Sequence, residues 1–234
     1  MTLGVPPVAR ASASGALRLR VARERALIAC FELGQQKTFR LRAAKLYAFG
    51  VFVTYAIAIS VTRASGRSAA IQGCLHSALI ALSWAVGALA ALGTAQGLTN
   101  QPERDGLGAL ALQRGFDARA ILRARTLAGA LRVARLIGIP ALLLVGVAVA
   151  RGQALVWALA TAPAVIVYAA GLGLCLAALA HFSSQLAPRH PRALLAALVL
   201  GPALISQVYS AVPSVPGLFA GWLDLLLGAG AAYT

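Results

Sequence analysis

Residues 97–135 read GLTNQPERDGLGALALQRGFDARAILRARTLAGALRVAR and separate two long apolar runs. The stretch carries seven arginines and three acidic residues, whereas the runs on either side of it are almost free of charge. A connection between two packed helices is usually about 2–8 residues long. A connection of this length therefore predicts structure of its own, inserted between two helices of an apolar bundle.

The composition of the whole chain indicates a polytopic membrane protein. Of its 234 residues, 60% are hydrophobic and 12% are charged, and the mean hydropathy is +0.80. Soluble domains have roughly 45–50% apolar and about 25% charged residues. This composition excludes a soluble enzyme, a disordered chain and a fibrous protein. The apolar runs are long, rich in alanine and leucine and without period-two alternation, so the predicted fold class is all-α.

Six segments are predicted to cross the membrane. A helix needs about 20 residues to cross a hydrocarbon core of roughly 30 Å. The predicted spans cover residues 46–62, 69–95, 133–150, 154–180, 193–211 and 217–233, within a transmembrane domain of residues 46–234. One alternative stays open for the last segment. If it re-enters the membrane instead of crossing it, the C-terminal end lies on the outer side.

Positive charge alternates along these spans. Nine lysines and arginines precede the first span, seven arginines lie in residues 97–135, and two arginines precede the fifth span. The remaining cations, Arg63, Arg67 and Arg151, lie in the other connections. Cytoplasmic loops carry the excess of positive charge, so the N-terminus and residues 97–135 are predicted to be cytoplasmic in a multi-pass inner-membrane protein. Topology thus accounts for the net charge of +15, and no nucleic-acid partner is expected.

The segment before the first span divides into a tail and a helix. Residues 1–16 are rich in Ala, Ser and Pro and are predicted to be disordered. Residues 17–45 are basic and are predicted to form a cytoplasmic helix whose apolar residues share one side: Leu17, Val21, Leu27, Ile28 and Phe31. This helix either lies in the membrane interface near anionic lipids or is a basic flank that sets the topology.

Residues 98–132 are predicted to contain two cytoplasmic helices. The first covers residues 102–114, with acidic residues in its first turn that favour the helix dipole, and Gly115 ends it. Asp117 is a suitable N-cap for a second helix that begins at Ala118 and continues into the third span. The first helix contains two glycines and is expected to gain stability by docking on a partner. The alternative is a solvated basic loop with a topological role.

The same stretch resembles the type-2 ABC exporter permeases, the membrane subunits of ATP-driven exporters. The resemblance rests on Glu103-Arg104-Asp105-Gly106, on Leu110 and Leu112, on Gly115 and Asp117, and on Ile121-Leu122 with Arg125. The six-span plan, the basic N-terminal helix and the alternation of charge are also similar to that family.

The resemblance implies that residues 102–114 form a coupling helix that docks on a separate ATP-binding cassette ATPase subunit. Its expected contact residues are Glu103, Arg104, Asp105, Gly106 and Arg114. The chain has no G-x-x-x-x-G-K-[ST] phosphate loop, so ATP and Mg are expected on the partner and the chain is expected to be a transport subunit without catalytic, cofactor or metal sites of its own. A second permease copy, identical or homologous, is expected to complete the pathway.

Two other functions stay open. One is a membrane-embedded enzyme that acts on lipid headgroups, because Asp105-Gly106, Gly115 and Asp117 match part of the metal-binding motif of CDP-alcohol phosphotransferases. The other is an accessory subunit that scaffolds a membrane assembly. The three cysteines are dispersed and predict neither a disulfide framework nor a zinc site.

Asp224 is the one acidic residue inside a predicted span. An ionisable group there costs at least about 2.5–3.5 kcal/mol on insertion scales, so Asp224 is a candidate functional residue. It is predicted to line the substrate pathway, or to pair with His76 or with an arginine near a helix end. Gln72 and His76 are four residues apart and share one helix face, so they are candidate pathway residues too. The alternative is that Asp224 lies near the membrane surface and that His76 is a packing residue.

Overall fold

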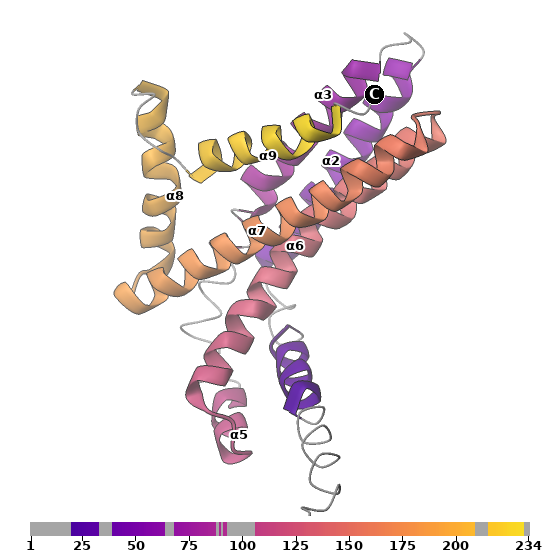
Figure 1. Cartoon of the computed structure of the whole chain (residues 1–234). Coiled ribbons are helices and arrows are strands. Elements are labelled where there is room, and N and C mark those ends of the chain that lie inside the picture. Colours follow the sequence, from indigo (N-terminus) through magenta and orange to yellow (C-terminus); the bar gives the residue numbers. More distant parts are fainter. Residues whose placement is uncertain are drawn as a thin grey trace, which may run out of the picture.

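The computed structural model describes residues 20–32, 39–63, 68–87, 89, 91–92, 106–208 and 215–231 (Figure 1). Within these ranges every regular element is a helix, which confirms the predicted fold class. The tail over residues 1–16 that the sequence predicts to be disordered lies outside the described residues.

The described helices follow the apolar runs of the sequence, and each of the six predicted spans overlaps one of them. In chain order they are a helix over residues 20–32, α2 (Phe39–Arg63), α3 (Ser68–Ala81), the π-helix η2 (Leu82–Gly87), α5 (Leu107–Gln113), α6 (Ala118–Ala150), α7 (Leu155–Leu186), α8 (Pro191–Val208) and α9 (Val215–Ala231).

Among the described residues, three helices are long and apolar enough to cross a bilayer. They cover Arg42–Thr62, Ala118–Ala150 and Leu155–Leu186. Ala70–Trp84 is an apolar helix of shorter length. The chain therefore has the helices of a multi-pass membrane protein. By length and composition, three of the described helices qualify as membrane spans, so the predicted number of six is not shown.

The helix α6 begins at the residue that the sequence predicts. Asp117 is its N-cap, with an extended backbone, and the helix runs without a break from Ala118 to Ala150. The Asp117 side chain makes no capping hydrogen bond, so its contribution is the charge near the helix N-terminus. A helix of 33 residues is about 50 Å long, whereas the hydrocarbon core is roughly 30 Å thick. When its C-terminal part lies in a membrane, roughly 20 Å of α6 extends beyond it.

The helices α6 and α7 form an antiparallel hairpin and are the most extensively packed pair of the fold (Figure 1). Gly152 in the turn between them has a φ of 95°, a conformation that glycine adopts without steric cost. Farther along the pair, a Cβ atom at Gly173 would lie 2.5 Å from the carbonyl oxygen of Ala130. The missing side chain at Gly173 therefore permits the close approach of the two backbones.

Tyr168 connects three helices in the core. Its side chain is 1% exposed, and its hydroxyl oxygen lies 2.8 Å from Ser83 Oγ of η2. Its ring packs against Phe219 and Trp222 of α9, with ring centres 6.1 and 6.0 Å away. Trp222 also covers Gly171 of α7, where a Cβ atom would lie 2.3 Å from the indole ring. The aromatic cluster thereby packs α9 on α7.

Replacing Tyr168 with phenylalanine is expected to lower the free energy of unfolding by about 1 kcal/mol, because Ser83 loses a buried hydrogen-bond partner. Thermal unfolding of the purified protein in detergent measures the change. Tyr47→Phe is the matched control, since Tyr47 is 44% exposed on α2 and its hydroxyl should contribute little. An unchanged unfolding midpoint for Tyr168→Phe would show that the contact between the two hydroxyls does not stabilise the fold.

The direction of α9 fits the re-entrant alternative for the last segment. Trp222 contacts Tyr168, which is level with η2, whereas Asp224 contacts His76 of α3, the helix that leads from the α2–α3 connection to η2. The helix α9 therefore points toward the end of the bundle where α2 joins α3, and Figure 1 shows its C-terminal part beside α3. A sixth span that returned to the end of α5 would run in the opposite direction.

Candidate functional site

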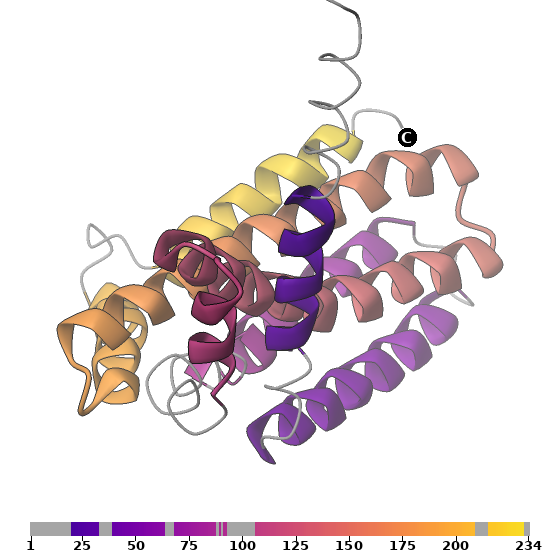
Figure 2. The ribbon, with the colours of Figure 1, turned by 90° about the horizontal axis from the view of Figure 1, so that it is seen from below.

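Three segments pack together around the N-terminal end of α6, a helix that is longer than a membrane span requires. They are the helix over residues 20–32, α5 and residues 118–132 of α6, and we call them the basic extension. Figure 2 views the molecule from this end and shows α5 and the helix over residues 20–32 side by side in front of the longer helices. In the sequence-based topology this end is cytoplasmic.

Two glycines delimit α5. Gly106 at its N-terminal end has a φ of 62°, and Gly115 after its last turn has a φ of 79°. The prediction that Gly115 ends this helix is confirmed, whereas the predicted start at residue 102 is not, because the left-handed backbone of Gly106 makes Leu107 the first helical residue. Two of the predicted ATPase-contact residues, Gly106 and Arg114, are described, and both are exposed. The other three lie outside the described residues: Glu103, Arg104 and Asp105.

A small apolar cluster connects the three segments of the basic extension. Its buried members come from all of them: Phe31, Ala111, Ile121, Ala124 and Ala128. Leu27, Ile28 and Phe116 pack around these residues. The guanidinium carbon of Arg125 lies 5.0 Å from the centre of the Phe31 ring, a cation–π arrangement. Leu27, Ile28 and Phe31 of the apolar side predicted for the N-terminal helix therefore pack on α5 and α6, whereas Val21 of the same side is 42% exposed.

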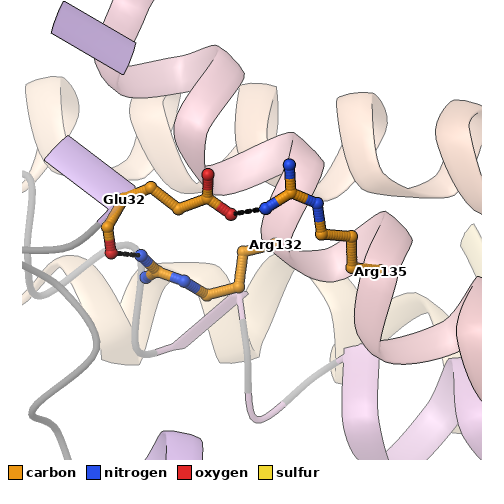
Figure 3. A network of polar contacts seen from close by, with 3 residues as sticks. All are labelled: Glu32, Arg132 and Arg135. Atoms are coloured by element: carbon orange, nitrogen blue, oxygen red, sulfur yellow. Dashed lines mark hydrogen bonds and ion pairs between the residues drawn. The ribbon is translucent and has the colours of Figure 1, made fainter. Parts of the chain in front are cut away.

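A polar network attaches the C-terminal end of the helix over residues 20–32 to α6 (Figure 3). The carboxylate of Glu32 forms an ion pair with Arg135, and Arg132 Nη2 donates a hydrogen bond of 2.9 Å to the Glu32 carbonyl oxygen. Arg132 is 7% exposed and the Glu32 side chain is 16% exposed. Charges with so little access to water must be paired and hydrogen-bonded, so these contacts favour one position of the helix on α6.

A groove of about 400 Å³ lies between α5 and the helix over residues 20–32. Arg23 and Arg114 line it, one from each side, and we call it the Arg23–Arg114 groove. Most of its other lining is apolar: Ala26, Leu27, Phe31, Leu110, Ala111 and Phe116. Guanidinium groups beside an apolar groove suit a partner segment that presents both acidic and apolar side chains.

Two exposed leucines lie on α5. Leu110, which lines the groove, is 49% exposed, and Leu112, which is not among the lining residues, is 55% exposed. Exposed leucines on a membrane span face lipid, whereas the sequence-based topology places α5 in the cytoplasm. Exposed apolar side chains grouped on such a surface are typical of a protein interaction site.

Two of the three predicted pathway residues meet in the structure. His76 Nε2 lies 2.8 Å from Asp224 Oδ1, which confirms the predicted pairing of these residues. Gln72 lies one turn before His76 on the same face of α3. Among the described residues, no group of three or more His, Cys, Asp or Glu side chains is placed to hold a metal ion.

The sequence pattern does not predict a site at Arg23, Glu32 or Arg132. The signal in the sequence is the apolar side of residues 17–45, which predicts either a helix in the membrane interface or a basic flank that sets the topology. A helix side rich in Leu and Phe fits a protein surface as well as lipid, so residue pattern alone does not distinguish the two.

Comparisons with known proteins identify no relative of this chain. No protein-family model matches it, and neither a curated protein nor a solved structure does.

Proposed function

We propose that this chain is the transmembrane permease subunit of an ATP-driven ABC exporter. A separate ATPase subunit binds ATP and Mg, and its motion is transferred to the membrane helices of the permease. The resemblance of residues 103–125 to the type-2 exporter permeases supports this function. The basic extension is a second line of support, because it offers a surface on which a soluble partner is able to dock.

The exposed apolar surface of α5 carries the proposal. Leu110 lines the Arg23–Arg114 groove, Leu112 is exposed elsewhere on α5, and the excess of positive charge assigns both to the cytoplasmic side. A soluble partner with apolar and acidic side chains would cover the leucines and pair with the arginines. Four residues that precede α5 or begin it are assigned to the same contact: Glu103, Arg104, Asp105 and Gly106.

Motion at α5 has two routes into the membrane. Because α6 is continuous from Ala118 to Ala150, a displacement of its N-terminal end also tilts its membrane part. The helix over residues 20–32 is attached to α6 through Glu32 and precedes α2 in the chain. Closure of the ATPase subunits on ATP would therefore move α2 and α6 together as rigid bodies.

The proposed arrangement places five helical segments across the inner membrane and α9 within it. The crossing segments are α2, α3 with η2, α6, α7 and α8, and α9 re-enters from the outer side. The excess of positive charge places α5 and the N-terminal end in the cytoplasm. These helices are few for a complete pathway, so a second permease copy, identical or homologous, completes it.

Co-expression with ATPases encoded beside this chain tests the proposed function. An ATPase is expected to stay bound when the chain is purified in mild detergent. The double variant Leu110→Asp, Leu112→Asp should reduce the retained ATPase at least about tenfold, because it removes the apolar contact and opposes an acidic partner with negative charge.

Leu186→Asp is the matched control for this experiment. Leu186 is also an exposed leucine, 61% accessible, but it lies at the end of α7 and outside the basic extension. This variant should retain the ATPase as well as the unaltered chain does. Absence of any bound ATPase from the unaltered chain, or an equal loss in the control, would contradict the proposed function.

A further inference from the structure

An ion pair joins two apolar helices on the side of the molecule away from α5. His76 Nε2 of α3 lies 2.8 Å from Asp224 Oδ1 of α9. The His76 side chain is 31% exposed, whereas the Asp224 side chain is 68% exposed. The Asp224 carboxylate is therefore held by His76 and is open to a further partner.

The helices that carry this pair contain no permanent positive charge. There is no lysine or arginine in α3, η2, α7 or α9, and Arg192 lies at the start of α8. The cations of α2, which packs against α3, lie near its two ends. Among the described residues, His76 is the titratable group within ion-pair distance of Asp224. In the part of the chain that the structure describes, no permanent cation lies within ion-pair distance of Asp224, so a bound cation would offset its charge in this apolar setting.

The surface around Asp224 has room for a ligand with a hydrocarbon chain. One turn before Asp224, Gly221 has open space where a Cβ atom would be. The flanking side chains of Leu218 and Leu225 are 64% and 74% exposed. A carboxylate offers about four lone-pair positions. His76 Nε2 lies close to Oδ1 but has no hydrogen-bond partner among the described residues, so these positions are able to accept hydrogen bonds from a cationic N–H donor.

We infer that Asp224 and His76 form a binding site for the ammonium group of an amphiphilic molecule. The ammonium donates to the accessible carboxylate of Asp224, and the hydrocarbon chain lies against the open side of α9 at Gly221. His76 is a positioning residue that lies against the Asp224 carboxylate and fixes its place. The binding site itself does not depend on the proposed function. Transport of the bound molecule does rest on it: as a permease subunit, a chain with this site would carry cationic amphiphiles.

Binding of decylammonium to the purified chain in nanodiscs of zwitterionic lipid tests the site. Calorimetric titration, with empty nanodiscs as the blank, should show saturable binding of decylammonium but not of decyl sulfate or decanol. Asp224→Asn preserves the shape of the side chain and removes its charge, so it should weaken binding roughly tenfold or more. His76→Ala should also weaken binding, and His76→Gln, which keeps a polar side chain beside Asp224, should restore most of it.

Glu24→Gln is the matched control, since it removes a carboxylate from the helix over residues 20–32. It should bind decylammonium as the unaltered chain does. A second variant, Gly221→Leu, leaves the ion pair in place and fills the open space, so it should weaken binding even if Asp224→Asn does not fold. Unchanged affinity in the folded Asp224→Asn or Gly221→Leu protein would overturn the site. No ATPase takes part in this titration, so its result is independent of the co-purification experiment.

Discussion

Gly173→Ala is expected to lower the free energy of unfolding by about 2–3 kcal/mol, a cost typical of overpacking a close contact. The added Cβ would lie 2.5 Å from the Ala130 carbonyl oxygen and 3.2 Å from the Ala134 nitrogen. Both of these are backbone atoms, which cannot rotate away as a flexible side chain does. The helices α6 and α7 must therefore separate and lose packing along the most extensive helix pair of the fold.

Unfolding of the purified protein in detergent, by heat or by sodium dodecyl sulfate, measures this loss. Gly146→Ala is the matched control, because Gly146 also lies in the hairpin but has open space around its Cβ position. Alanine has the higher helix propensity, so the control should be unchanged or more stable by up to about 1 kcal/mol. If Gly173→Ala were as stable as the control, the close approach of the two backbones would be wrong.

Phe31→Ala is expected to detach the helix over residues 20–32 from the rest of the basic extension. Phe31 is 6% exposed and packs in the cluster that joins α5 to α6, beside Arg125. Removing a buried aromatic side chain costs about 3–5 kcal/mol, which is large compared with what so small a cluster contributes. The longer helices have a separate core and should remain folded.

Limited digestion with trypsin measures this detachment, because the helix over residues 20–32 contains Arg23 and Arg25. Cleavage at these arginines should accelerate strongly in Phe31→Ala, while the unfolding midpoint of the membrane helices changes little. Val21→Ala is the control, since Val21 lies on the same helix and is 42% exposed. Equal cleavage rates in the two variants would show that Phe31 does not hold this helix in place.

The predictions that succeeded rest on local chemistry. Asp117 as the N-cap of α6, Gly115 as the end of α5 and the continuous helix from Ala118 all follow from residues within a few positions of each other. The pairing of His76 with Asp224 is a different case, since these residues are far apart in the sequence. It was predictable because few groups in the apolar helices are able to satisfy a carboxylate.

In the basic extension, the residue pattern alone does not predict which surfaces pack together. Leu27, Ile28 and Phe31 predict an apolar helix side, but α5 and α6 cover that side in the structure. Arg132 is a basic residue near the start of a predicted span, yet it is nearly buried against the helix over residues 20–32. The hydrophobic effect rewards the removal of apolar area from water whatever covers that area, so the pattern does not name the partner.

The residues of this chain determine on their own that it is helical, apolar and basic on alternate connections, because helix propensity, hydropathy and charge are properties of short segments. The placement of the helix over residues 20–32 on α6, the Arg23–Arg114 groove and the direction of α9 came from the tertiary structure alone. Each of these depends on contacts between segments distant in sequence, such as Glu32 with Arg135 and Trp222 over Gly171. Such contacts depend on how complementary surfaces fit in three dimensions, and no local pattern of residues encodes that fit.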